Sequence, residues 1–242
     1  MRILISNDDG IFAPGLAALV HAFAAAGHTV YVAAPDSQRS AASHSMTLFQ
    51  PLTAKKSAVA GASKAWAIDG TPVDCVKLAV KTLCPEVDFV ISGINHGYNS
   101  GSDVLYSGTV GAAMEGALNG KPAMAVSLGH EREDTYDNAA ALAVRVFDIL
   151  QAFSVLNLNY PETDEALGLK ATSLRALRYL DTYEPEMGAD GVTRYTLVGG
   201  MDKHMADGED DYTWLRRGYA TMTVLTYDLT HDAATKALED LI

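Results

Sequence analysis

Two adjacent carboxylates near the start of the chain are the side chains with the most informative chemistry. Asp8 and Asp9 follow the apolar residues 3–5 and precede Gly10, so a short buried strand delivers both acids to its carboxyl end. Neighbouring carboxylates repel each other unless a positive charge lies between them, and a divalent cation with oxygen ligands is the usual partner. Alternatively, the pair caps the helix predicted from Leu16 onward, which is the commoner role of an isolated Asp-Asp-Gly.

Polar segments follow two further predicted strands. The hydroxyl-rich residues 36–45 come after strand 29–34, and residues 93–99, rich in glycine and amides, come after strand 88–92. A hydroxyl-rich loop is most often a simple turn. In parallel α/β sheets, ligands bind in a crevice outside the carboxyl ends of the strands. Because the hydroxyl-rich loop follows the next strand after Asp8, its position favours a hydroxyl that points into the crevice beside Asp8. The glycines of the second loop suit close approach of the backbone to a ligand.

Another polar element begins the predicted helix 110–118. Ser107, Gly108 and Thr109 place backbone N–H groups and two hydroxyls at the positive end of the helix dipole, where phosphate binds well. An N-cap by Ser107 explains the same residue, and the two explanations are compatible. With a cation between the carboxylates, this helix start gives an acidic protein the means to bind an anionic small molecule.

Alternating strands and helices must position these loops. Apolar and β-branched runs predict strands at residues 3–5, 29–34, 65–68, 88–92, 122–127 and 154–159. Helical spacing of apolar residues predicts helices at residues 16–23, 73–80, 110–118 and 136–153. The alternation indicates an α/β fold with a doubly wound, mainly parallel sheet, in which the parallel strands end at one shared edge.

The pattern changes from about residue 171. Strands are predicted at residues 174–180, 193–198 and 220–227 without helices between them, followed by a short final helix that contains Ala237, Leu238 and Leu241. We therefore expect a catalytic core over residues 1–170. Residues 171–242 are expected to form a β-rich extension with a carboxyl-terminal helix, which serves oligomerisation or covers the cleft.

Composition excludes several classes of partner. The 242 residues carry a formal net charge of −12, and this acidic chain lacks the basic footprint that binding to a nucleic-acid duplex requires. No apolar run is long enough to span a membrane, and the amino terminus lacks the pattern of a secretory signal. Cys75 and Cys84 are expected to be free thiols in a reducing compartment. We therefore expect a cytoplasmic protein without a membrane partner.

Taken in chain order, these motifs resemble the SurE family, the survival-protein-E 5′/3′-nucleotidases. The resemblance is carried by residues 7–10, 34–40, 70–76, 92–95, 106–109, 113–116 and 217–220. Each motif alone is weak, but their common order and spacing along almost the whole chain are specific. The resemblance implies a Rossmann-like core with a projecting β-hairpin. It also implies a carboxyl-terminal segment exchanged between the subunits of a homodimer or homotetramer.

The resemblance further implies an activity and roles for individual residues. A single divalent ion, Mg²⁺ or Mn²⁺, would be held by Asp8, Asp9, Ser40 and Asn95. Phosphate would be bound by Asn99, Ser107, Gly108 and Thr109. The implied reaction is the hydrolysis of nucleoside monophosphates, with short polyphosphate a substrate of some members. Residues 42–44 and 183–208 depart from the family pattern, which leaves substrate preference and assembly open.

The residue chemistry agrees with a metal-dependent phosphomonoesterase. An oxygen-only ligand set suits Mg²⁺ or Mn²⁺, and the absence of a convincing cysteine or serine nucleophile favours direct attack by water. Asp8 and Asp9 are the catalytic candidates, with Asp9 relaying a proton to the leaving alkoxide through a metal-bound water. His44 and His96 are weaker candidates, since a lone loop histidine is more often a surface residue. The alternative function is a non-catalytic, metal-dependent nucleotide-binding or regulatory protein.

Overall fold

The computed structural model describes residues 1–130, 135–202, 205–239 and 241, and in this part of the chain the centre is a nine-stranded sheet. Its strands are β1 (Arg2–Ser6), β2 (Thr29–Pro35), β3 (Ala54–Ser57), β4 (Lys64–Ile68), β5 (Phe89–His96), β6 (Ala123–Leu128), β7 (Val155–Tyr160), β8 (Leu169–Ala171) and β11 (Ala220–Leu225). They lie in the order β3-β4-β2-β1-β5-β6-β7-β11-β8. The pairs from β4 to β7 are parallel, while β3 and β11 pair antiparallel with β4 and β7. The predicted α/β class with a mainly parallel sheet is confirmed.

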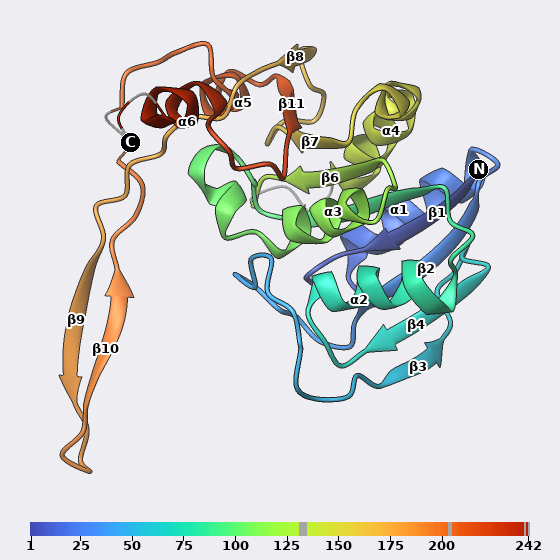
Figure 1. Cartoon of the computed structure of the whole chain (residues 1–242), viewed down its shortest axis with the longest axis horizontal. Helices are drawn as coiled ribbons and strands as arrows, with labels where there is room; N and C mark the ends of the chain where they lie inside the picture. The colour runs from blue at the N-terminus through green and yellow to red at the C-terminus, as the bar shows by residue number, and fades with distance from the viewer. Residues whose placement is uncertain (131–134, 203–204, 240, 242) are drawn as a thin grey trace.

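Helices cover both faces of the sheet (Figure 1). They are α1 (Pro14–Ala25), α2 (Pro72–Leu78), α3 (Gly108–Leu118) and α4 (Tyr136–Arg145), with α5 (Asp211–Arg216) and α6 (Asp232–Glu239) near the carboxyl terminus. On one face, α1 and α4 pack on Ile3 and Ile5, whereas Leu4 joins a second core with α2 and α3. Because successive side chains of a strand point to opposite faces, β1 contributes to both cores and is buried on both sides.

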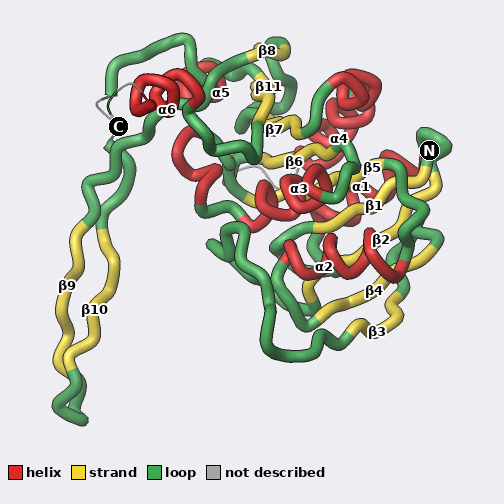
Figure 2. The backbone as a smooth tube through the Cα atoms, in the orientation of Figure 1, coloured by secondary structure: helices red, strands yellow, loops and turns green. Residues whose placement is uncertain are grey.

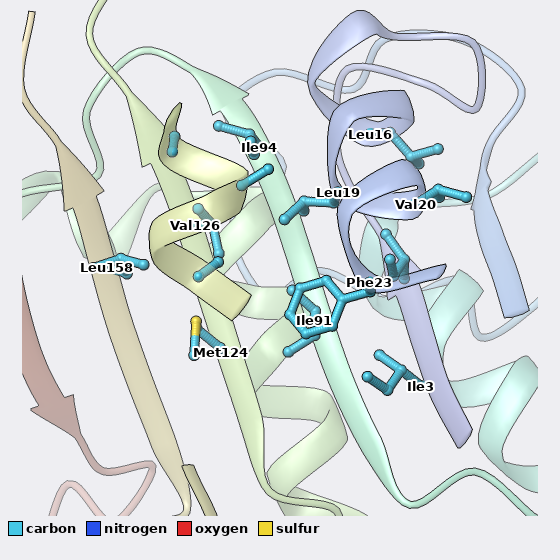
Figure 3. Packing of buried hydrophobic residues seen from close by; sticks show 14 of the residues in the cluster. Ile3, Leu16, Leu19, Val20, Phe23, Ile91, Ile94, Met124, Val126 and Leu158 are labelled. Atoms are coloured by element: carbon cyan, nitrogen blue, oxygen red, sulfur yellow. The ribbon is translucent and has the colours of Figure 1, made fainter. Parts of the chain in front are cut away.

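The core between α1 and the sheet shows why the amino-terminal unit folds as predicted. Leu16, Leu19, Val20 and Phe23 are fully buried on one side of α1 and pack with Ile91 and other strand residues (Figure 3). Full burial of each such side chain stabilises the fold by about 1.5–3 kcal/mol. This packing fixes the start of α1 relative to β1, and therefore the conformation of the loop that carries Asp8 and Asp9.

The strand order places the two acids at a reversal of the chain. From β1 the chain passes through α1 to β2 on one side, and it later returns through α2 to β5 on the other side of β1. In open α/β sheets, ligands bind outside the carboxyl ends of the strands at such a switch point. The loops after β1 and β5 therefore adjoin the place where this class of fold provides a crevice.

The carboxyl-terminal segment contributes to the sheet and also leaves it. Strand β11 pairs with β7, so part of the predicted extension lies in the central sheet. The strands β9 (Thr182–Met187) and β10 (Thr193–Val198) form an antiparallel hairpin that projects away from the sheet (Figure 1). Most of its residues are exposed.

Some predicted elements differ from the structure. Residues 174–180 do not form a continuous strand. The N–H groups of Arg175 and Leu177 donate to the side chains of Asp211 and Ser102, each at 3.0 Å, and only an isolated antiparallel bridge joins Tyr179 to Met201. Helix α4 ends at Arg145, and a 3-10 turn (Phe147–Ala152) replaces the rest of the predicted helix. Strands β3, β8 and β9 were not predicted from the residue pattern. A long loop joins β2 to β3 (Figure 2). Within the described residues, no helix has the length and apolarity needed to cross a bilayer.

Candidate active site

The loop after β1 is a tight turn that presents both aspartates. Asn7 Nδ2 donates to the carbonyl oxygen of Gly10 at 3.0 Å, and Gly10 N donates to Asn7 Oδ1 at 3.2 Å. Gly10 has a φ of +103°, a conformation that side chains disfavour. The alternative that the acids cap α1 is wrong, because its N-cap is Ala13 and its first turn contains no acidic residue. Asp8 and Asp9 are therefore available for another role.

Asp8 lies against the start of α3. The hydroxyl of Thr109 donates to Asp8 Oδ1, and a Cβ at Gly108 would lie 3.0 Å from Asp8 Oδ2. Asp8 is only 6% exposed. Burial raises its pKa to about 6, although the bond from Thr109 lowers it, and the neighbouring charge of Asp9 adds to the rise. The acidic loop and the helix start that sequence analysis selected separately are in direct contact.

Asp9 is bonded to the loop after β2 and to the carboxyl end of β5. The backbone N–H of His96 donates to Asp9 Oδ2 at 3.3 Å, next to Asn95 in the chain. The side chain of Gln38 donates to Asp9 Oδ1 at 3.5 Å and to Ser40 Oγ at 3.0 Å. Burial raises the pKa of Asp9, and the His96 N–H together with the nearby imidazoles lowers it. Strand β5 continues through His96, so Asn95 lies in the strand and not in the loop predicted from residue 93. These bonds bring the Ser40 loop and the carboxyl end of β5 to the same carboxylate.

Asn95 and Asn99 are held differently at the carboxyl end of β5. Asn95 Nδ2 donates to the Gly97 carbonyl at 2.8 Å, which leaves the side-chain oxygen as the atom suited to a cation. Asn99 is buried, and its Nδ2 donates to Ser127 Oγ at 2.8 Å. A phosphate contact from Asn99 would use the second hydrogen of that amide.

The start of α3 is capped as expected. Ser107 Oγ accepts a hydrogen bond from Val110 N at 3.0 Å, so Ser107 is the N-cap of the helix. The cap does not exclude anion binding, because a single side chain satisfies only one of the amide groups at a helix start. Ser107 and Thr109 are both buried beside the acidic loop.

The donor set fits a hard divalent cation. Among the described residues, no group of three or more His, Cys, Asp and Glu side chains is placed to hold a metal, and neither Asp8 nor Asp9 forms an ion pair. The remaining candidates at the site are carboxylate, hydroxyl and amide oxygens, which Mg²⁺ and Mn²⁺ prefer over the nitrogen and sulfur ligands typical of zinc. A cation would also compensate the adjacent negative charges, one of which is buried.

Several polar residues around the site were not predicted from the sequence. Gln38 bridges Asp9 and Ser40, and His130 packs edge to face against His96 with ring centroids 5.0 Å apart. The position of His130 just beyond β6, on the same sheet edge, was the available signal. Glu115 on α3 is 3% exposed and binds His44, Lys77 and Asn119. Nothing local in the sequence distinguishes such a residue from an ordinary helix-surface glutamate.

The Glu115 cluster leads to a prediction about acid stability. Burial raises the pKa of Glu115, but hydrogen bonds from its three partners outweigh burial and lower the pKa from 4.5 to about 2. Because the folded-state pKa is depressed, the ionised carboxylate stabilises the fold above the ordinary pKa. That contribution is lost as the pH falls toward 2. Glu115→Gln should therefore lower the free energy of unfolding by about 1–3 kcal/mol at neutral pH.

Urea unfolding of both proteins, from neutral pH down to about pH 3, measures this effect. The difference between wild type and Glu115→Gln should shrink steadily through the acid range. A difference that stays constant over the same range would show that the charge of Glu115 contributes nothing. Glu184→Gln, on the exposed hairpin, serves as a control for the loss of one surface carboxylate.

The chain is similar to proteins of one family along its whole length. A family model described as survival protein SurE matches residues 3–181. The chain is 43% identical to the 5′-nucleotidase SurE of Desulforudis audaxviator, covering 99% of this chain and 96% of the relative. It is 42% identical to the protein of the same name from Synechococcus elongatus, with 100% and 99% covered. The crystal structure of the SurE protein from Aquifex aeolicus superposes with a TM-score of 0.85 at 32% identity, covering 100% of this chain and 99% of that one.

Proposed function

The chain belongs to the survival protein SurE family, and from that premise we propose that the loops after β1, β2 and β5 and the start of α3 form its active centre. The protein is a 5′-nucleotidase, an enzyme that hydrolyses phosphoric monoesters, as its relatives' names indicate. The observation that carries the proposed location is the contact between Asp8 and Thr109. It joins a buried carboxylate to a helix start that suits an anion, an arrangement that a bound cation and a phosphate would both stabilise.

The proposed metal ligands are the oxygen atoms of four side chains: Asp8, Asp9, Ser40 and Asn95. When bound, Mg²⁺ or Mn²⁺ would supply positive charge to the phosphoryl oxygens and make water a better nucleophile. Support comes from the oxygen-only donor set and from the hydrogen bonds that link the Ser40 loop and the carboxyl end of β5 to Asp9. Phosphate would be bound by Asn99, Ser107, Gly108 and Thr109.

The remaining chemistry is assigned to water and to Asp9. Cys75 and Cys84 are buried, and burial raises the pKa of each thiol, so neither is an effective nucleophile. Donors at the start of α3 would stabilise the charge that develops on the equatorial oxygens of the phosphoryl group. Asp9 is half-buried and accepts a bond from the His96 N–H at the site, which suits a carboxylate that would pass a proton from a bound water to the leaving alkoxide.

Phosphate release tests the proposal. Purified protein should release phosphate from AMP or GMP in the presence of Mn²⁺ or Mg²⁺, lose that activity in excess chelator, and regain it when the metal is restored. A panel of 5′- and 3′-monophosphates across several divalent metals would define substrate position and metal preference. Metal-dependent nucleotide binding without phosphate release would favour the regulatory alternative. Undiminished release after complete metal removal would contradict the metal centre.

We also propose that the protein assembles as a homodimer or homotetramer in the cytoplasm, with residues 171–242 as the assembly element and residues 1–170 as the catalytic core. The hairpin supports this role, because Tyr183, Met187 and Tyr195 expose large apolar surfaces on it. The two free cysteines are consistent with a reducing compartment.

A further inference from the structure

The loop that carries Ser40 has an unusual backbone. Ala41 and Ser43 have φ values of 56° and 54°, in the left-handed region that residues other than glycine seldom adopt. Such a conformation persists only where surrounding contacts hold it, and residues of this kind cluster at functional sites. The contacts that hold this loop therefore also determine where the hydroxyl of Ser40 lies.

Contacts to the segment before α3 hold the middle of the loop. Ser43 N donates to the Tyr106 carbonyl at 3.0 Å, and Ser43 Oγ donates to the Leu105 carbonyl at 2.7 Å. Directly beneath, a Cβ at Gly111 would lie 2.6 Å from the Ser43 carbonyl oxygen. Only glycine at this position allows the loop to approach α3 so closely.

His44 anchors the end of the same turn. Its Nε2 lies 3.1 Å from Glu115 Oε2, one helical turn beyond Gly111 on α3. Glu115 is itself fixed, because Lys77 Nζ and Asn119 Nδ2 each donate to its other oxygen at 2.8 Å. The imidazole is partly exposed to solvent, but its Nε2 is bound to a buried carboxylate that two further partners hold in place.

We infer that Glu115, acting through His44, is a positioning residue that holds the Ser40 loop at the metal site. The inference rests on the proposed function, because Ser40 is one of the proposed ligands. Removal of the anchor should free the strained turn and weaken metal binding. Chemistry should remain intact once the metal is saturating, since neither His44 nor Glu115 contacts the reacting atoms in this assignment.

His44 contacts Glu115 through Nε2, and this allows a test with two different amide substitutions. The amide nitrogen of glutamine occupies roughly the position of Nε2, whereas that of asparagine lies nearer Nδ1. His44→Gln should therefore retain the bond to Glu115, while His44→Ala and His44→Asn should lose it. Gly111→Ala perturbs the loop independently, from the helix beneath. His21→Ala on the exposed side of α1 is the matched control.

The Kd for Mn²⁺, measured by electron paramagnetic resonance of the free ion, is the first readout. We expect His44→Ala, His44→Asn and Gly111→Ala to raise it by about 10-fold or more, with His44→Gln and His21→Ala close to wild type. At saturating Mn²⁺, kcat for AMP should differ from wild type by no more than about threefold in all variants. Hydrogen exchange of residues 40–46 in metal-free protein should accelerate in the same three variants.

Each contrary result has a distinct meaning. An unchanged Mn²⁺ affinity in His44→Ala, with wild-type exchange in the loop, overturns the inference. A loss of kcat at saturating metal that is equal in His44→Gln and His44→Ala also overturns it, because that pattern marks a proton donor. A wild-type protein that binds no Mn²⁺ and releases no phosphate would instead refute the proposed function, and the inference with it.

Discussion

Asp8→Asn is expected to abolish hydrolysis of nucleoside monophosphates while leaving the metal-free protein at least as stable as wild type. Burial raises the pKa of Asp8 to about 6, so ionisation of this carboxylate at neutral pH destabilises the fold. Asparagine removes the charge and still offers an oxygen to the hydroxyl of Thr109. The same substitution removes a charged ligand from the proposed centre, and a loss of at least about 10³-fold in kcat/KM is expected.

Thermal unfolding with and without chelator, together with phosphate release from AMP, measures both parts. In chelator the melting temperature of Asp8→Asn should equal or exceed that of wild type, and added Mn²⁺ should stabilise wild type alone. Asp137→Asn, which changes an exposed carboxylate on α4, should leave activity and metal response unchanged. A clearly less stable apo variant would mean that the negative charge of Asp8 supports the fold, contrary to its burial.

The fold class followed from local patterns in the sequence. The strands that form β1, β2 and β5 are short apolar runs ended by polar or turn residues, and such signals do not depend on distant contacts. The strands at the two edges of the sheet were harder to predict, because β3 is polar and β8 spans only Leu169–Ala171. Residues 174–180 resemble a strand in composition, but their backbone partners come from separate segments, among them Ser102, Gly200 and Asp211. The spacing of apolar residues along the chain gives no information about such long-range hydrogen bonds.

Some features of the candidate site could likewise be predicted from the sequence, whereas others depend on the tertiary structure. Asp8, Ser40 and Asn95 could be selected because each follows or ends a strand predicted to be parallel, and parallel strands deliver their carboxyl ends to one edge. The contact between Asp8 and Thr109 could not be predicted from the sequence, because it depends on how α3 packs on the sheet. The bond between His44 and Glu115 joins residues 71 positions apart and likewise requires the tertiary structure.

Asp9 differs from Asp8 in exposure and in partners, and this difference bears on the source of the leaving-group proton. Asp8 is buried against Thr109, whereas Asp9 is half-buried and accepts bonds from the loop after β2 and from the last residue of β5. Of the two acids, Asp9 is therefore the one with access to a bound substrate. A nucleoside alkoxide requires protonation as it departs, whereas a nitrophenolate is stable without a proton.

Asp9→Asn is accordingly expected to abolish turnover of AMP with the fold retained, and to affect p-nitrophenyl phosphate much less. At saturating Mn²⁺, we expect kcat to fall by about 10²–10⁴-fold for AMP and by about 10-fold or less for p-nitrophenyl phosphate. Circular dichroism and the Kd for Mn²⁺ separate this effect from unfolding and from weaker metal binding. Equal losses on both substrates would restrict Asp9 to holding the metal, and near-normal turnover of AMP would remove it from the mechanism altogether.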